Sequence, residues 1–163
     1  MHDQSVAVFD HFLGALSKVL AKAEAHCEAH KIDPAALLTA RLFPDMFTFT
    51  RQVQLATDFA KGPSARLAGV DIPSFEDTET TFGTLQARIA KTREFLATIT
   101  PAMLDGAAMR TIRFRARGQD HEAPGRAYLS MVALPNFYFH TTTAYNILRH
   151  NGVELGKGDF VGR

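Results

Sequence analysis

Asn136 and His140 lie one helical turn apart in residues 127–148, a segment that contains no Asp, Glu, Lys or Arg. A helix without a charged face is buried in protein or in lipid, and buried polar groups need hydrogen-bond partners. Because positions i and i+4 share one face, both side chains are expected to point into the same interior. There His140 could ligate a metal or carry a proton, with Asn136 as a weak oxygen ligand or an orienting group. The alternative is a structural histidine that bonds a neighbouring side chain or a water, and a single histidine beside an amide favours it.

Gln52 is a second polar side chain next to an apolar stripe, in a helix predicted to begin near Asp45. Phe49 precedes it by three residues, and Ala56 follows it by four. Gln52 can therefore face His140 across the interior, or it can reach solvent from the boundary of the stripe. The residues alone leave both possibilities open and favour the second.

Two further positions have the chemistry of metal ligands. His26 and His30 have the i, i+4 spacing that can bind zinc, but no third ligand lies nearby, so an exposed and unliganded pair is expected. Cys27 is the only cysteine, which excludes an internal disulfide and a cysteine-based zinc cluster. A reducing, cytoplasmic location is the corresponding expectation.

The charges are nearly balanced, with 18 Lys and Arg against 17 Asp and Glu, for a net charge of +1. This balance argues against a nucleic-acid partner. Arg113, Arg115 and Arg117 alternate along a predicted strand and could bind an anion, but such a row also protects a strand edge from aggregation, and the low net charge favours that role. A membrane partner is not expected either, because residues 127–148 contain Pro135 and several polar side chains.

Apolar residues spaced three and four apart predict four long helices. They cover about residues 3–31, 45–60, 77–98 and 125–151. Asp33 is expected to cap a short turn that begins with Pro34. Residues 61–63 (KGP) are expected to end the second helix, and a long irregular connection follows.

The period changes to two over residues 110–123, which predicts a small β-hairpin with its turn at residues 118–120. Ser74 with Asp77, or Thr78 with Thr81, offers a cap for the third helix. Residues 155–163 are expected to form a surface strap. The predicted fold is thus an all-α four-helix bundle, one domain over residues 1–163, with a β-hairpin between the third and fourth helices.

Six segments resemble the DinB/YfiT-like four-helix-bundle superfamily, and an uncharacterised branch of it in particular. The main ones are residues 134–140 (LPNFYFH) and 143–152 (TAYNILRHNG) in the last helix. The others are residues 51–54 (RQVQ), 60–62 (AKG), 75–79 (FEDTE) and 155–157 (LGK). The resemblance covers nearly the whole chain. It implies an up-down-down-up bundle with a long crossover after the second helix, and it implies homodimers.

The resemblance also implies where a metal would bind. Members with a metal commonly use three histidines, one from the second helix and two on the last helix. Matched onto this chain, these positions fall on Gln52, Asn136 and His140, of which only one is histidine. Neutral amides are poorer zinc ligands than imidazole. The expectation is therefore no cofactor or a weakly bound divalent metal at a degenerate site.

Three functions remain open at this point. The first is a DinB-like protein with a degenerate metal-site pocket between the second and fourth helices, which would bind a small molecule or persist as a buried polar network. The second is a divalent-metal-dependent transferase or isomerase that acts on a small molecule, with or without a thiol cofactor. In this enzyme His140 would ligate the metal. The third is a dimeric structural or interaction module.

Overall fold

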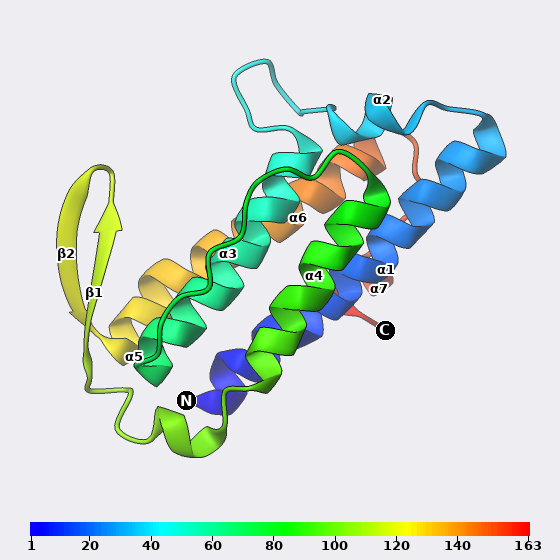
Figure 1. The fold of residues 1–163 in the computed structure, drawn as a ribbon. Coiled ribbons are helices and arrows are strands. Elements are labelled where there is room, and N and C mark those ends of the chain that lie inside the picture. The colour runs from blue at the N-terminus through cyan, green and yellow to red at the C-terminus, as the bar shows by residue number, and fades with distance from the viewer.

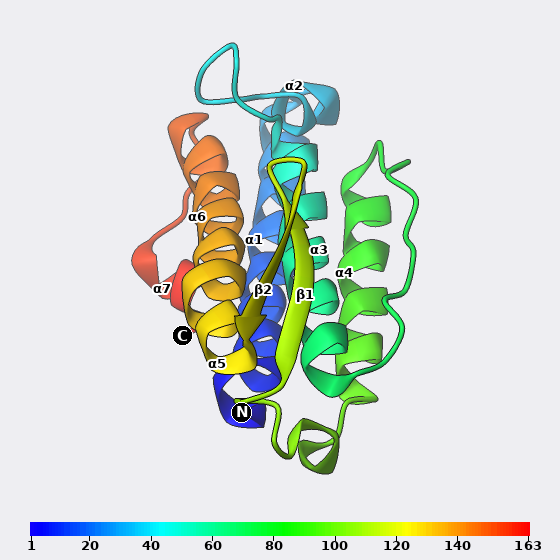
Figure 2. The ribbon, with the colours of Figure 1, turned by 90° about the vertical axis from the view of Figure 1, so that its left-hand side faces the viewer.

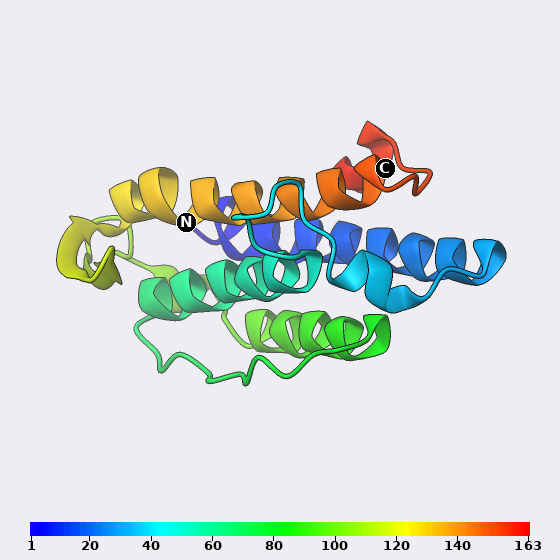
Figure 3. The ribbon, with the colours of Figure 1, turned by 90° about the horizontal axis from the view of Figure 1, so that it is seen from above.

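Four long helical segments lie side by side in the computed structural model, which describes residues 1–163 (Figure 1). They are α1 (Val6–His30), α3 (Phe49–Ala68), α4 (Phe82–Ala97) and a last rod that ends in α6 (Leu134–His150). Figure 1 shows α1 and α6 running in one direction and α3 and α4 in the other. Seen from above, α3 lies between α4 and α6, and it packs against both (Figure 3).

Helix α1 forms because one stripe of apolar side chains repeats along its length and is buried. That stripe is Val6, Phe9, Leu13, Leu16, Leu20, Ala23 and Cys27. The helix ends where Lys31 adopts a left-handed conformation with a φ of 54°. Asp33 then caps α2 (Pro34–Leu38) by accepting a hydrogen bond from the Ala35 N–H, as predicted.

Helix α3 differs from its prediction at both ends. It begins at Phe49, where the Thr48 side chain accepts a hydrogen bond from the Arg51 N–H, and not near Asp45. It also continues through Pro63, so the break predicted at residues 61–63 is wrong. Proline removes one helical hydrogen bond, but residues 60–65 are all buried, and this packing holds the segment helical.

The connection from α3 to α4 lies later in the chain than predicted, because α3 continues to Ala68 and α4 begins at Phe82 rather than near Asp77. The cap is a reciprocal bond between Thr81 and Thr84, so neither predicted pair, Ser74 with Asp77 or Thr78 with Thr81, caps this helix. Residues 69–81 therefore form an irregular crossover that runs along the outside of α3 and α4 (Figures 1 and 2).

A two-stranded antiparallel sheet follows α4 and the short 3-10 helix η2 (Pro101–Leu104). Its strands are β1 (Thr111–Ala116) and β2 (Gln119–Pro124), paired so that Arg113 faces Glu122. The turn between them has positive φ angles of 50° at Arg117 and 76° at Gly118. In Figure 2 the hairpin stands in front of α1 and α3, and its base lies at the lower end of the last rod.

The last rod begins with α5 (Gly125–Tyr128), continues through the π-helical turn η3 (Leu129–Ala133) and ends as α6. Gly125 must be glycine, because a Cβ there would lie 2.0 Å from the carbonyl oxygen of Ala107. The tail predicted as a surface strap contains α7 (Lys157–Val161), which packs on α1.

The prediction of a mostly helical fold with a small hairpin is confirmed in this form, with the short helices α2, α5 and α7 in addition to the long ones. One hydrophobic cluster of 32 buried residues joins α1, α3, α4 and α6, so the long helices share a core. None of the helices combines the length and the apolar character that crossing a membrane requires.

Candidate functional site

His140 and Gln52 meet in the interior between α6 and α3. Gln52 is 1% exposed and His140 is 7% exposed. The Nδ1 atom of His140 lies 2.8 Å from the Oε1 atom of Gln52. The amide nitrogen of Gln52 donates to the carbonyl oxygen of Phe47 at 3.4 Å, which fixes the orientation of the amide. The structure therefore brings together two of the three predicted site residues.

This contact assigns the tautomer of His140. An amide oxygen only accepts, so Nδ1 carries the proton and Nε2 keeps a lone pair. Burial, and to a smaller extent the positive charge of Arg51, lowers the pKa of His140 to about 4, against the opposing effect of Asp58. The ring also stacks on Phe59, with centroids 5.4 Å apart and an interplanar angle of 21°. His140 is thus a neutral imidazole at physiological pH.

Asn136, the third predicted residue, does not join this pair. Its side-chain nitrogen donates to the carbonyl oxygen of Val132 at 2.7 Å, one turn earlier in the same rod. Asn136 is half-buried and instead lines a neighbouring cavity. The spacing of four residues is correct, but the amide bonds its own helix rather than Gln52 or His140.

The residues at this position do not fit a zinc-type metal. The structure has no group of three or more His, Cys, Asp and Glu side chains arranged to hold an ion. Only one imidazole is available, the Gln52 oxygen is bound to its Nδ1–H, and the Asn136 amide is turned towards Val132. Zinc sites in proteins use histidine, cysteine and carboxylate ligands, so we derive no metal chemistry from this donor set.

A cavity of about 520 Å³ lies next to the His140–Gln52 pair, between α3, the hairpin and the last rod. Phe59 connects the two sites, because it stacks on His140 and also lines the cavity. The residues that line the cavity are Asp58, Phe59, Pro63, Arg66, Phe114, Arg115, Ala116, Arg117, Tyr128, Val132 and Asn136. Most of them were not predicted, because the hairpin brings residues 114–117 to α3 from a distant part of the chain.

Arg88 is the centre of a buried ionic network that sequence analysis missed. Its side chain is 1% exposed and forms ion pairs with Asp58 (3.0 Å), Asp77 (3.0 Å) and Glu79 (3.1 Å). It also donates from Nε to the hydroxyl of Thr57 at 2.7 Å. The one signal was its position on the inner side of α4, three residues after the buried Leu85.

Asp58 and Arg51 belong to the same network. Asp58 pairs with Arg88 and, at 2.6 Å, with Lys61, while Arg51 pairs with Asp77. Both side chains are only about one-third exposed, at 32% and 35%, so neither is an ordinary surface charge.

Comparison with known proteins places the chain in a family. The family described as a domain of unknown function, DUF1993, matches residues 1–161. The crystal structure of a DinB family member from Shewanella denitrificans is similar over 99% of this chain and 92% of that chain, with a TM-score of 0.94 and 42% sequence identity. No curated protein matches the chain. The chain therefore belongs to the DUF1993 family and is a DinB-like protein.

Proposed function

We propose that this DinB-like protein binds a small molecule beside His140, at a degenerate metal-site pocket between α3 and α6, without using a catalytic metal. The observation that carries the proposal is the bond from His140 to the Gln52 oxygen. It occupies one imidazole nitrogen and leaves Nε2 as a hydrogen-bond acceptor. The courses of α1, α3, α4 and α6 support the up-down-down-up bundle that a DinB-like fold implies.

We favour ligand binding over proton transfer as the role of His140, because its imidazole is a weak base. A general base is most effective when its pKa lies near the working pH. The pKa of His140 is lowered to about 4, chiefly by burial, so the ring is a weak base at neutral pH. Such a ring accepts a hydrogen bond from a ligand hydroxyl or amide better than it removes a proton.

Metal analysis of the purified protein tests the proposal. We expect no stoichiometric Zn, Ni, Fe or Mn in the wild type. We expect His140→Ala to lower the free energy of unfolding by about 1–3 kcal/mol, because it leaves the buried Gln52 oxygen without its donor.

A stoichiometric metal in the wild type that disappears in His140→Ala would contradict the proposal. It would favour the divalent-metal-dependent transferase or isomerase in its place. His30→Ala is the matched control, because His30 is exposed and its ring bonds only to the carbonyl oxygen of His26.

We also propose that the protein forms homodimers. Phe43, Phe47 and Phe139 are large apolar side chains that remain 62%, 55% and 57% exposed in one chain. Apolar side chains left on a surface are typical of interaction sites when they gather. Two of them adjoin the proposed site. The carbonyl oxygen of Phe47 accepts a hydrogen bond from the Gln52 amide, and the ring of Phe139 lies 5.3 Å from the ring of His140 between centroids.

A further inference from the structure

We propose that the cavity between α3, the hairpin and the last rod binds the carboxylate of a small, largely apolar acid, with Arg66 and Tyr128 as its receptor. The inference names a ligand class for the small-molecule binding proposed above and rests on that role. Its test is separate, because metal content decides whether a metal occupies the His140 position and carboxylate affinity decides the ligand class.

The first observation is the charge of the cavity lining. Arg66, Arg115 and Arg117 line the cavity, and none of them has a carboxylate within ion-pair distance. Asp58 is the only acidic residue in the lining, and its Oδ1 is already bound to Lys61 at 2.6 Å and Arg88 at 3.0 Å. The cavity therefore has an excess of positive charge, which favours an anionic ligand.

The second observation is that Arg66 and Tyr128 both keep donor groups that no side-chain acceptor occupies. The Nη1 atom of Arg66 donates a hydrogen bond to the hydroxyl of Tyr128 at 3.4 Å. This is the only side-chain hydrogen bond of either residue. Tyr128 is 3% exposed, and burial raises the pKa of its hydroxyl, so the proton stays on the oxygen at physiological pH. Its O–H and the remaining guanidinium N–H groups can both donate to one carboxylate.

The third observation is the apolar part of the wall. Phe59, Pro63, Phe114 and Val132 line the same cavity, and the Phe114 ring lies 4.9 Å from the Tyr128 ring between centroids. A volume of about 520 Å³ is within the range of small-molecule sites. An aryl or alkyl chain can lie against these side chains while its carboxylate reaches Arg66.

The arginine row, with Arg113 and Arg115 in β1 and Arg117 in the turn that follows, divides between the two roles that the sequence left open. Arg113 pairs with Glu122 across the hairpin at 2.6 Å, is exposed and does not line the cavity, as expected of an edge-protecting charge. Arg115 and Arg117 line the cavity without such a partner. Arg113 is therefore a matched control for the cavity arginines.

Isothermal titration calorimetry with 4-phenylbutanoate and its neutral analogue 4-phenylbutanamide tests the inference. We expect the acid to bind the wild-type protein at least tenfold more tightly than the amide, because hydrogen bonds to a charged group exceed those to a neutral one. Arg66→Gln and Tyr128→Phe should each weaken binding of the acid by about tenfold and weaken binding of the amide much less, because the amide oxygen carries no net charge. Arg113→Gln should change neither.

Gly62→Ala provides a variant that keeps every charge. A Cβ at Gly62 would lie 3.0 Å from the Arg66 Nη1 atom, so the guanidinium must shift by a few tenths of an ångström. The substitution suits a helix interior, so the thermal midpoint should not fall. We expect a several-fold loss of affinity for the acid in a protein as stable as the wild type, which a purely structural role of Arg66 would not produce.

Four results would overturn the inference. The first is no measurable heat with 4-phenylbutanoate, phenylacetate or octanoate at millimolar concentration. The second is equal affinity for the acid and the amide. The third is an equal loss of affinity in Arg113→Gln and Arg66→Gln. Tighter binding of phenyl phosphate than of the carboxylates would also reject the ligand class, because it would assign the receptor to phosphate monoesters.

Discussion

At the scale of single residues, His140 links stability to pH. Its pKa is about 4 in the folded protein and 6.5 without the fold, so the unfolded chain binds more protons between these values. The contribution of the neutral ring to the free energy of unfolding is therefore fully present above pH 6.5, and it is lost as the pH falls to 4. A difference of this size corresponds to about 3 kcal/mol.

Urea unfolding of wild type and His140→Gln between pH 7.5 and pH 4 measures this contribution. The variant should lose less stability than the wild type over the interval, because glutamine does not titrate. Identical slopes in the two proteins would mean that the imidazole is not buried as a neutral group.

Ser64 gives a second prediction at this scale. Its hydroxyl is buried and has no hydrogen-bond partner. An unsatisfied buried hydroxyl costs about 1–3 kcal/mol, and alanine is the better helix former, so Ser64→Ala should raise the free energy of unfolding by about 1 kcal/mol. Thr57→Val is the control and should be destabilising, because the Thr57 hydroxyl accepts from Arg88. A loss of stability in Ser64→Ala would show that the hydroxyl has a partner.

The sequence predicted the site in part. Gln52 and His140 could be paired because each lies on or beside an apolar stripe, and packing turns such stripes towards each other. The position of the Asn136 amide could not be predicted, because its bond to Val132 competes locally with any partner across the interior. Tyr128 could not be predicted as a site residue, because its role depends on its hydrogen bond with Arg66, which is 62 residues away in the chain.

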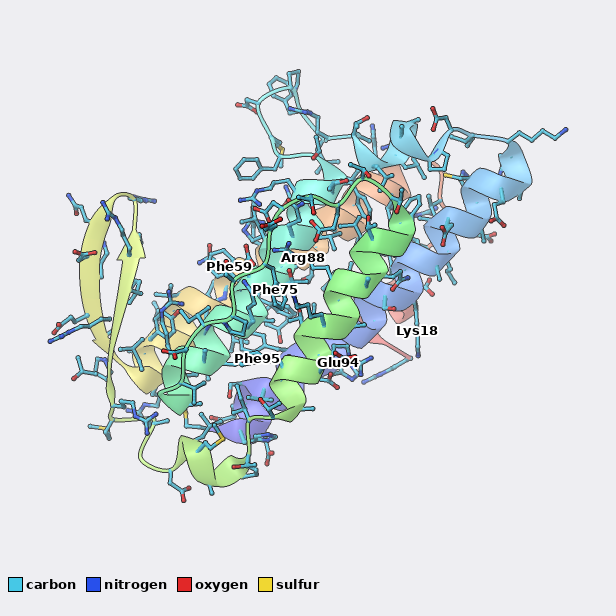
Figure 4. All side chains as sticks on the ribbon, viewed as in Figure 1. Lys18, Phe59, Phe75, Arg88, Glu94 and Phe95 are labelled. Carbon is cyan, nitrogen blue, oxygen red and sulfur yellow. The ribbon has the colours of Figure 1, made fainter.

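At the scale of elements, the crossover is held to the bundle by one buried arginine. Arg88 bonds the carbonyl oxygen of Glu76 at 3.0 Å, as well as the side chains of Asp77 and Glu79. Phe75 lies against the cations of Lys61, Arg88 and Lys91, with ring distances of 4.8, 5.7 and 4.3 Å. Figure 4 shows Phe75 and Arg88 next to each other where the crossover passes α3 and α4.

Arg88→Met should lower the free energy of unfolding by about 3–5 kcal/mol, because it leaves partly buried carboxylates without their cation. Arg93→Met is the control in the same helix. Arg93 bonds Asp10 at 2.7 and 3.1 Å, but the two side chains are 43% and 42% exposed, so the loss should be below about 1 kcal/mol. Denaturant unfolding measures both, and equal losses would contradict a special role for the buried network.

The element boundaries show what local sequence leaves undecided. The stripes predicted the long helices because period and burial agree. The predicted start of α4 was wrong, because residues 75–79 carry acidic side chains that bind Arg88. This tertiary contact keeps those residues out of the helix. Pro63 was expected to end α3, but the packing of its neighbours outweighs the lost hydrogen bond.

At the scale of the whole molecule, we predict that the protein is a homodimer in solution. Sedimentation velocity should give twice the chain mass of 18.0 kDa at micromolar concentration. Phe139→Lys should shift the distribution towards monomer, because it places a charge on an exposed apolar position. Met109→Lys is the control, since Met109 is 77% exposed and precedes the hairpin. A monomer at all concentrations would reject the proposal.

The π-helical turn η3 has a consequence for how the two halves of the last rod are oriented. A π-helical turn corresponds to one residue more than an α-helical turn would hold, and each residue advances a helix by roughly 100°. Tyr128 precedes the turn and His140 follows it. Removing a single residue from positions 129–133 would therefore rotate the cavity tyrosine away from the hairpin while His140 stayed opposite Gln52. The length of this turn therefore sets the shape of the cavity independently of the position of the imidazole.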